Sequence, residues 1–417
     1  MPAERFRIEV PEPVLKDLRE RIARTRWPDE IPGAGWRYGA STAYLTELLA
    51  YWRDGFDWRA RERSLNELSH FRADIGGLRV HFVHERGEGP APMPLIVTHG
   101  WPSSFFEMTK LIPLLTRPSE HGGRAEDAFD VVVPSLPGTG FSDIPSTPGM
   151  TKTRIAGLWA ALMTDVLGYP RFGARGGDIG SGVTAWLAVD HPDRVAGIHV
   201  SDVLRPALGP GSAPLSPAER RFLDEEIAWM EREGAYDRIQ ATKPQTLAHG
   251  LTDSPAGLAA WLVEKFRSWS DCGGEIERRF SRDDLLTHLT IYWVTGTINA
   301  ANRLYFDRDQ APRALAPGQR VEVPCAVSLF PADIDHPPRE WAERACRVER
   351  WTEMPRGGHF AAWEEPQLLA EDLREFFRPL REAGDGVGKR EPSDQRERDG
   401  RGTTRSTRSG IGIERQT

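Results

Sequence analysis

The stretch GARGGDIGSGVTAW, residues 173–186, predicts a β-strand that ends in a sharp turn and is followed at once by a helix. Glycine residues lie close to Asp178 on both sides, as a backbone that reverses direction so tightly requires. The N-terminus of the following helix stabilises negative charge at this position. The turn therefore places an ionised carboxylate at its apex.

This turn has one structural and two functional interpretations. Glycine-rich turns after strands are common and often have no catalytic role. Residues 180–185 fit the dinucleotide pattern G-x-G-x-x-A, with Asp202 downstream for a ribose, but the first glycine comes too late after the strand for a pyrophosphate turn. The remaining interpretation is the nucleophile elbow G-x-S-x-G of α/β hydrolases, with Asp178 in the place of the serine.

The composition is typical of a globular protein with a sizeable core. Of 417 residues, 39% are hydrophobic, and a net charge of −7 without a long basic stripe argues against a nucleic-acid partner. The sequence has no signal-peptide pattern and no run of about 18 apolar residues, so neither secretion nor a membrane anchor is expected. Cys272, Cys325 and Cys346 form no C-x-x-C motif, which predicts reduced thiols, a cytoplasmic location and no zinc site.

The predicted organisation is an N-terminal segment, residues 1–88, followed by an α/β core. The segment opens with two amphipathic helices, at 11–28 and 44–52, and ends in a strand at 77–85. In the core, apolar runs alternate with helical stretches, which predicts a buried, mostly parallel sheet with strands at 95–98, 130–134, 172–175, 195–202 and 323–331.

A helical cap is predicted to interrupt this core at residues 208–322, where only helical patterns occur. Two Ser-Pro pairs begin helices there, at Ser216 and Ser254, and Glu219 completes a capping box with the first serine.

The cap divides the core into residues 89–207 and residues 323–382, and the second part closes with an amphipathic helix. Residues 383–417 contain no aromatic residue and are predicted to form a disordered tail.

The loop after the first core strand reads THGWPSSFFE, residues 98–107. Its structural interpretation is a proline-containing turn into a helix that Ser104 and Glu107 cap. In α/β hydrolases this loop supplies one N–H of the oxyanion hole, and the residue after the nucleophile supplies the other. Here these residues are Trp101 and Ile179.

His359 lies in a loop with two glycines, RGGHFAAWEEP, before the last predicted helix. An isolated histidine is more often structural than catalytic, but His359 stands where the chain order nucleophile, acid, histidine requires the base. The acid is Asp333 or Asp335. Both follow the predicted strand at 323–331, and either could hold the imidazole in the correct tautomer.

Three tyrosines, Tyr236, Tyr292 and Tyr305, lie in the predicted cap. Tyrosines in helices mostly serve packing, but each also carries an O–H donor that could bind a substrate oxygen. The residue pattern does not rank the three.

A carboxylate at the elbow changes the chemistry that the turn can support. A carboxylate attacks carbonyl groups poorly, but it displaces a strained or good leaving group from saturated carbon. The resulting ester carries its carbonyl on Asp178, where His359 can activate water against it and the oxyanion hole can serve the second step. Epoxides and haloalkanes fit this scheme, and no metal or cofactor is expected.

The chain resembles the epoxide hydrolases of the α/β-hydrolase fold, in particular the microsomal-type branch with an N-terminal extension. The resemblance covers residues 4–380 and rests on FRIEVPEPVLKDLRERIARTRWP at 6–28, HGWP at 99–102, the elbow at 176–181, the segment at 242–269 and GGHFAAWEEPQLLAEDLREFF at 357–377.

The resemblance implies an α/β-hydrolase fold and a role for five residues. The nucleophile matches Asp178, the base His359 and the relay acid Asp333, while Tyr236 and Tyr305 match the two cap tyrosines that bind the epoxide oxygen. The implied partners are a small apolar epoxide and water. Two departures are the aspartate at a relay position that is usually glutamate and the missing membrane anchor, which implies a cytosolic enzyme.

Two other functions are weighed against this one. Haloalkane dehalogenases share the aspartate nucleophile but carry a halide-binding tryptophan directly after it, where this chain has Ile179. A catalytically silent binding protein of this fold typically loses the nucleophile or the histidine, and both are present here. The physiological epoxide, the carbon attacked and the formation of a homodimer are left open by the sequence.

Overall fold

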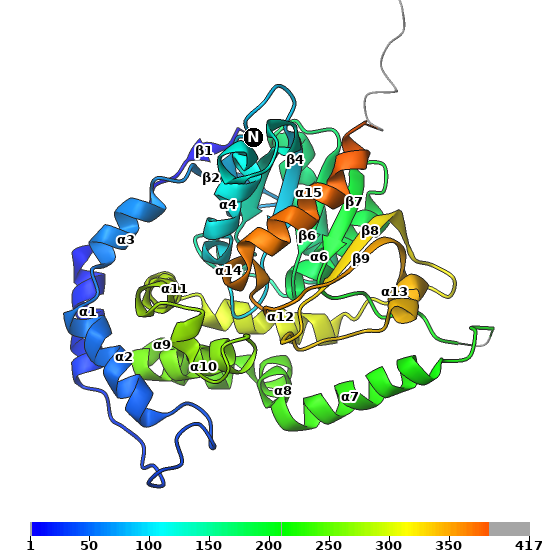
Figure 1. The fold of residues 1–417 in the computed structure, drawn as a ribbon. Coiled ribbons are helices and arrows are strands. Elements are labelled where there is room, and N and C mark those ends of the chain that lie inside the picture. Colours follow the sequence, from blue (N-terminus) through cyan, green and yellow to red (C-terminus); the bar gives the residue numbers. More distant parts are fainter. Residues whose placement is uncertain (1, 210, 383–417) are drawn as a thin grey trace, which may run out of the picture.

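The computed structural model describes residues 2–209 and 211–382, which form a nine-stranded sheet with helices on both faces and a group of cap helices at one edge (Figure 1). The strands lie in the order β1-β2-β3-β5-β4-β6-β7-β8-β9. The pairs from β1 to β5 are antiparallel, and those from β5 to β9 are parallel. The mostly parallel sheet is therefore as predicted, while the predicted tail lies outside the described residues.

The strands of this sheet are β1 (Glu4–Arg5), β2 (His70–Ile75), β3 (Leu78–Glu85), β4 (Met93–Thr98), β5 (Phe129–Pro134), β6 (Phe172–Gly176), β7 (Val195–Val200), β8 (Val321–Leu329) and β9 (Cys346–Glu353). The α-helices outside the cap are α1 (Glu12–Ala23), α2 (Thr42–Asp54), α3 (Trp58–Leu65), α4 (Leu111–Thr116), α5 (Lys152–Ala161), α6 (Ile179–Asp190), α13 (Arg339–Ala345), α14 (Ala361–Glu364) and α15 (Pro366–Glu382). Shorter helical turns are η1 (Phe105–Lys110), η2 (Pro118–His121), η3 (Ala125–Asp127), η4 (Leu162–Val166) and η5 (Ile276–Arg278).

The centre of the sheet is buried on both faces. Every residue of β5, β6 and β7 is buried, which explains why these strands read as continuous apolar runs. Helices α5 and α6 pack together. Helix α4 packs with α15, and the two lie side by side in Figure 1. Helix α15 lies so close to β6 that a Cβ on Gly173 would come 2.6 Å from the Phe377 ring, so this strand position requires glycine.

The cap consists of α7 (Pro217–Glu233), α8 (Ala235–Thr242), α9 (Pro244–Asp253), α10 (Pro255–Ser268), α11 (Arg282–Thr295) and α12 (Ile298–Gln310). The predicted capping box is present, because Ser216 accepts from the Glu219 N–H while the Glu219 carboxylate accepts from the Ser216 N–H. Ser254 caps α10 in the same way through the Gly257 N–H. These helices all lie within the predicted cap, residues 208–322.

The N-terminal segment contributes more to the sheet than its sequence indicates. Beyond the predicted helices α1 and α2 and strand β3, it forms α3 and the strands β1 and β2, and β3 pairs with β5 of the core. Helix α2 also holds the cap. Trp52 donates its indole N–H to Thr290 at 2.9 Å and Tyr51 donates its hydroxyl to Asp283 at 2.8 Å. The segment is therefore fastened to both core and cap.

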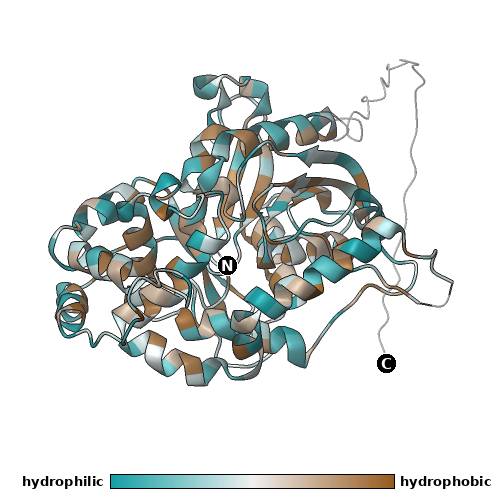
Figure 2. Cartoon of the chain, turned by 60° about the horizontal axis from the view of Figure 1, so that its bottom comes forward, coloured by the Kyte–Doolittle hydropathy of each residue, from teal (hydrophilic) through white to brown (hydrophobic). Residues whose placement is uncertain are grey.

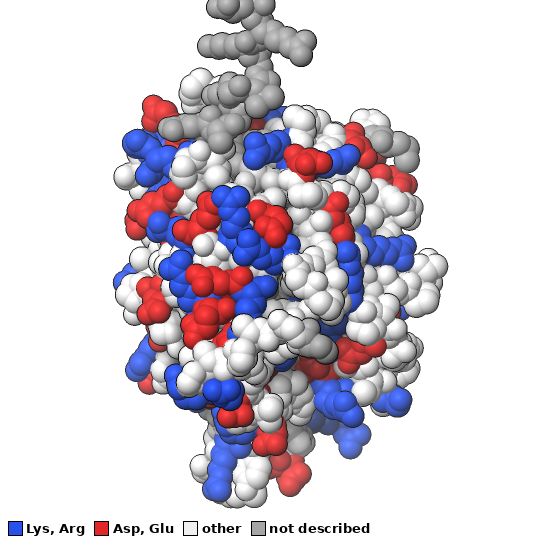
Figure 3. Space-filling model, turned by 90° about the vertical axis from the view of Figure 1, so that its right-hand side faces the viewer, with Lys and Arg blue, Asp and Glu red and all other residues white. Residues whose placement is uncertain are grey.

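Hydrophobic residues are concentrated inside the molecule and hydrophilic residues on its outer turns (Figure 2). Basic and acidic side chains are interspersed on the face shown in Figure 3, as expected from the balanced charge of the sequence. Among the described residues, no helix has the length and apolar character needed to span a membrane.

Candidate active site

The site is centred on the turn between β6 and α6. Asp178 stands at its apex with φ of 53°, and it is the single non-glycine residue at positive φ in the described ranges. A Cβ on Gly176 would lie 2.0 Å from the Gly180 carbonyl oxygen, and one on Gly180 would lie 2.2 Å from the Thr98 oxygen. Strand and helix therefore approach too closely for any residue but glycine at these positions, and the strained turn holds Asp178 in one orientation.

The Asp178 carboxylate faces the loop after β4. Its Oδ1 accepts a hydrogen bond from the Trp101 N–H at 2.7 Å, and the backbone N–H of Asp178 donates to Asp202 Oδ2 at 2.7 Å. Of the two predicted oxyanion-hole donors, Trp101 thus already contacts the carboxylate. Ile179 is the first residue of α6, but within the described residues no hydrogen bond joins its N–H to that carboxylate. The role of Ile179 stays a prediction.

His99 fixes the loop that carries Trp101. Its Nδ1–H donates to the Gly100 carbonyl at 2.9 Å, and its Nε2 accepts from the Leu136 N–H at 3.2 Å. Burial lowers the pKa of His99 to about 4, so the ring is neutral and can accept that second bond. The histidine of the HGWP motif is therefore a structural residue of the loop.

His359 lies between β9 and α14 and reaches the same site. Its backbone N–H donates to the Trp269 carbonyl at 2.9 Å, and a Cβ on the preceding Gly358 would lie 2.7 Å from that oxygen. The Nδ1–H of His359 donates to Asp333 Oδ1 at 2.7 Å, and both side chains are only 4% exposed. Burial lowers the pKa of His359, but the charges of Asp333 and Asp178 outweigh it and raise the pKa to about 10.

Asp335 does not share this arrangement. It is half-buried, and no hydrogen bond joins it to His359 within the described residues. Burial and the charges of Asp202 and Asp333 raise the pKa of Asp335 to about 8, so it is largely neutral at neutral pH. A neutral carboxyl stabilises an imidazolium poorly, and the geometry therefore favours Asp333 as the partner of the histidine.

The cap places Tyr236, on α8, and Tyr305, on α12, over Trp101. The Tyr236 ring stacks on the Trp101 ring with centroids 5.1 Å apart, and the Tyr305 ring meets it edge-on at 5.8 Å. The Tyr305 hydroxyl is buried without a hydrogen-bond partner among the described residues. Burial and the charge of Asp178 raise the pKa of both tyrosines, so both keep their O–H donors.

Tyr292, on α11, has a different position. Its hydroxyl donates to the Ser103 carbonyl at 3.0 Å and so ties the cap to the loop that carries Trp101. Because this donor already has a partner, Tyr292 is suited to hold the loop and not to bind a substrate oxygen.

Three charged residues of the site were missed or misassigned from the sequence. The prediction that Glu107 caps a helix together with Ser104 is wrong. Ser104 alone caps η1, and the Glu107 carboxyl instead accepts a hydrogen bond from the Ser103 hydroxyl at 2.5 Å. Burial raises the pKa of Glu107, and burial lowers that of Arg175 to about 10. Asp202 is not a ribose ligand after a dinucleotide motif, because its carboxylate accepts a hydrogen bond from the backbone N–H of Asp178.

A small cavity of about 20 Å³ has Trp101, Glu107, Arg175, Asp178 and His359 in its wall. Its volume corresponds to roughly one water molecule, and its wall offers several polar partners. The cavity therefore suits a single water between the carboxylate and the imidazole.

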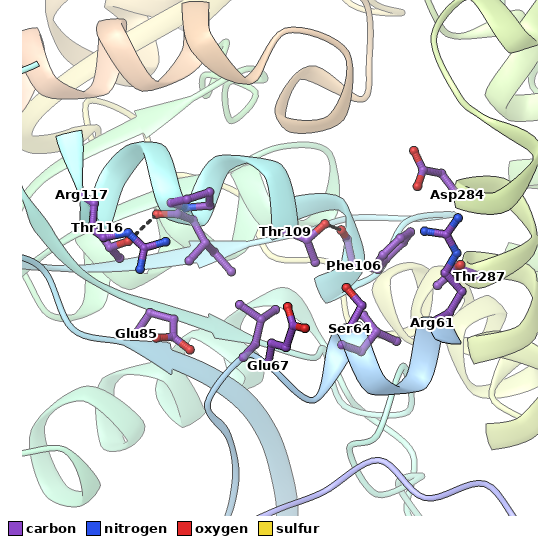
Figure 4. Close-up of a pocket in the computed structure, with 14 residues that line it drawn as sticks. Arg61, Ser64, Glu67, Glu85, Phe106, Thr109, Thr116, Arg117, Asp284 and Thr287 are labelled. Atoms are coloured by element: carbon purple, nitrogen blue, oxygen red, sulfur yellow. Dashed lines mark hydrogen bonds between the residues drawn. The ribbon is translucent and has the colours of Figure 1, made fainter. Parts of the chain in front are cut away.

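A second pocket, of about 90 Å³, is lined by Asp178 together with Tyr236 and Tyr305. Asp178 thus contributes to both spaces. A larger hollow of about 480 Å³ lies between α3, α4 and α11, where Figure 4 shows Arg61, Thr109 and other side chains around it. None of the predicted site residues lines that hollow.

Comparison with protein families identifies both parts of the chain. Residues 3–108 match the family described as epoxide hydrolase N terminus, and residues 93–269 match the α/β hydrolase fold. The chain is 43% identical over 380 residues to a protein of Stigmatella aurantiaca provisionally named epoxide hydrolase, covering 90% of this chain and 85% of that protein. It is 37% identical over 400 residues to epoxide hydrolase 1 of Oryctolagus cuniculus, covering 89% and 88%.

Solved structures agree with this assignment. The juvenile hormone epoxide hydrolase of Bombyx mori superposes with a TM-score of 0.84 at 31% identity, covering 92% of this chain and 95% of that one. The Aspergillus niger epoxide hydrolase superposes with a TM-score of 0.79 at 29% identity, covering 91% and 97%.

Proposed function

This chain belongs to the epoxide hydrolases of the α/β-hydrolase fold, and from that premise we propose that it opens an epoxide to a vicinal diol through a covalent ester on Asp178. The observation that supports this route is that Asp178 lines two separate spaces. One is the pocket that Tyr236 and Tyr305 also line, and the other is the cavity that His359 also lines. The nucleophile can therefore meet the epoxide in the first space and water in the second.

In the first step, a carboxylate oxygen of Asp178 attacks an epoxide carbon and the ring C–O bond breaks. Negative charge develops on the released oxygen, to which Tyr236 and Tyr305 donate hydrogen bonds. Ring strain supplies part of the driving force, and the released oxygen takes its proton from the hydroxyl of Tyr236 or Tyr305, which leaves a tyrosinate. The product of this step is a hydroxyalkyl ester whose carbonyl belongs to Asp178.

In the second step, Nε2 of His359 takes a proton from water, and the hydroxide attacks the ester carbonyl. The Trp101 N–H, joined in our proposal by the Ile179 N–H, stabilises the oxyanion, and its collapse breaks the ester C–O bond. The leaving diol oxygen takes the proton held by His359, and the second water proton passes from the Asp178 carboxyl to the tyrosinate, which restores both groups. Ester formation also removes the Asp178 charge, which is one cause of the raised pKa of His359. The pKa of His359 should therefore fall once the ester forms, which favours the neutral base when it is needed.

Oxygen-18 labelling tests the covalent route. A single turnover with enzyme in excess, in oxygen-18 water, is expected to release mostly unlabelled diol, because one Asp178 oxygen leaves with the product and water replaces it in the enzyme. Mass spectrometry of the diol and of the peptide that contains Asp178 locates the label. Immediate labelling of the diol, with no label in that peptide, would mean direct attack by water.

The cap tyrosines provide a second prediction. Tyr236→Phe and Tyr305→Phe are each expected to lower kcat/KM for styrene oxide by about a hundredfold, because each removes one donor to the developing oxyanion. Tyr292→Phe is the matched control, and it should change kcat/KM less than about tenfold, since its hydroxyl serves the loop at Ser103. If Tyr292→Phe lowered kcat/KM more than the other two variants, the residue that donates to the oxyanion would be Tyr292, on α11.

We also propose a cytoplasmic location. Cys272, Cys325 and Cys346 are all buried and free, which supports a compartment that keeps thiols reduced.

A further inference from the structure

The pocket of Tyr236 and Tyr305 contains two cations that the proposed reaction does not use, and they differ in whether they have an ion-pair partner. Lys152, the first residue of α5, lines this pocket beside Asp178. Within the described residues its ammonium has no ion-pair partner within 4.0 Å and no hydrogen bond. The other cation of the pocket, Arg308, is already paired with Asp237 through two bonds of 2.8 and 3.0 Å.

The side chain of Lys152 is held in place by its contact with α6. A Cβ on Gly182 would lie 2.5 Å from Lys152 Cδ and 2.9 Å from Nζ, so the lysine lies against a helix position that has no side chain. Its head group is therefore kept near the reacting carboxylate.

The surroundings of Lys152 leave its charge incompletely solvated. Met150, Ile155 and Leu304 form apolar walls of the same pocket, and the side chain is half-buried. Burial lowers the pKa of Lys152, while the charge of Asp178 opposes that effect. When Asp178 becomes an ester this counter-charge is lost while the charges of Asp202 and Asp237 remain, so the half-buried ammonium is less well compensated.

We propose that Lys152 is a specificity residue that binds a carboxylate carried by the substrate, so that the enzyme prefers epoxides with an anionic substituent close to the oxirane. This inference rests on the proposed function and adds one charged contact between the pocket and the substrate. The carboxylate pairs with the ammonium and replaces the counter-charge of Asp178 after the ester forms. An uncharged isostere of the same shape lacks this contact.

Matched acid and amide substrates test the proposal. The probes are 3-phenylglycidate and 4-oxiranylbenzoate, each beside its primary amide, and the readout is the ratio of kcat/KM for acid over amide. The wild type is expected to prefer the acid by about tenfold or more in at least one pair, the effect of roughly one charge-assisted hydrogen bond. Lys152→Met should lower that ratio by about tenfold, and Lys152→Arg should keep most of it.

Two further variants separate the charge from its position. Gly182→Ala, which displaces the lysine, should lower the ratio as Lys152→Met does. Lys16→Met removes a lysine whose side chain is 72% exposed on α1, and it should leave the ratio at the wild-type value.

Several outcomes would overturn the inference. If Lys152→Met left the acid-over-amide ratio unchanged, or lowered kcat/KM equally for acid and amide, Lys152 would not contribute to the preference for a charged substrate. If the wild-type protein hydrolysed neither these epoxides nor styrene oxide, the result would contradict the proposed function, and the inference about Lys152 would fail with it.

Discussion

Replacement of His359 by glutamine is expected to yield an enzyme that alkylates itself once and then stops. Glutamine has no basic nitrogen, so water near the ester is no longer activated, and turnover should fall by about three to four orders of magnitude. The first step needs only Asp178 and the tyrosine donors, and it should proceed. Intact-mass spectrometry is expected to show a gain equal to one epoxide, located by peptide mapping on Asp178.

The matched control is the double variant Asp178→Ala, His359→Gln, which should gain no mass because it lacks the nucleophile. Circular dichroism of both variants checks that the fold persists. A folded His359→Gln protein that shows no adduct, although it still binds epoxide, would contradict the covalent mechanism and the assignment of Asp178.

Replacement of Asp333 by asparagine is expected to have the second large effect. Asp333 accepts from His359 Nδ1 at 2.7 Å, and an amide in its place cannot stabilise the imidazolium that forms as water gives up its proton. Turnover should fall by about four orders of magnitude, the loss seen when a triad carboxylate becomes an amide. Asp333 is also the first of the charges that raise the pKa of His359, so this pKa should fall in the variant.

Asp335→Asn is the matched control, with an expected loss of less than about tenfold, because this carboxyl is mostly neutral at neutral pH and does not bond the histidine. Titration of the His359 imidazole by NMR distinguishes an electrostatic role from a merely structural one. If Asp335→Asn lost more activity than Asp333→Asn, and also lowered the pKa of His359 more, the relay acid would lie two residues further along.

The features that the sequence determined are those with a local pattern. The strand, turn and helix around Asp178 follow from the spacing of small residues, and the capping box at Ser216 follows from residues three positions apart. Alternating apolar strands and helices predicted the sheet, and the motifs predicted the family. Each of these depends on contacts between near neighbours in the chain, or on a periodicity that a single segment displays.

The choice between Asp333 and Asp335 had no such signal. Residues two positions apart have the same parity in an extended chain, so a pattern of alternation assigns both to one side. The bend after β8 separates them, with the Asp333 N–H donating to the Phe330 carbonyl at 3.0 Å. The residue pattern also did not distinguish the three cap tyrosines. In the structure, the Tyr292 hydroxyl on α11 donates to the carbonyl of Ser103, which lies 189 residues away in sequence, and this contact separates Tyr292 from the other two.

Only the tertiary structure brought Glu107, Arg175, Asp202 and Lys152 to the nucleophile. A charged residue inside an apolar strand, such as Arg175, is a signal that the sequence does contain. The sequence did not show which acidic residues lie near Arg175, because these residues come from other strands and loops. Burial and the nearby charges, not the residue types, set the pKa values of these groups. Such interactions depend on distances between residues far apart in the sequence, and those distances exist only after the chain has folded.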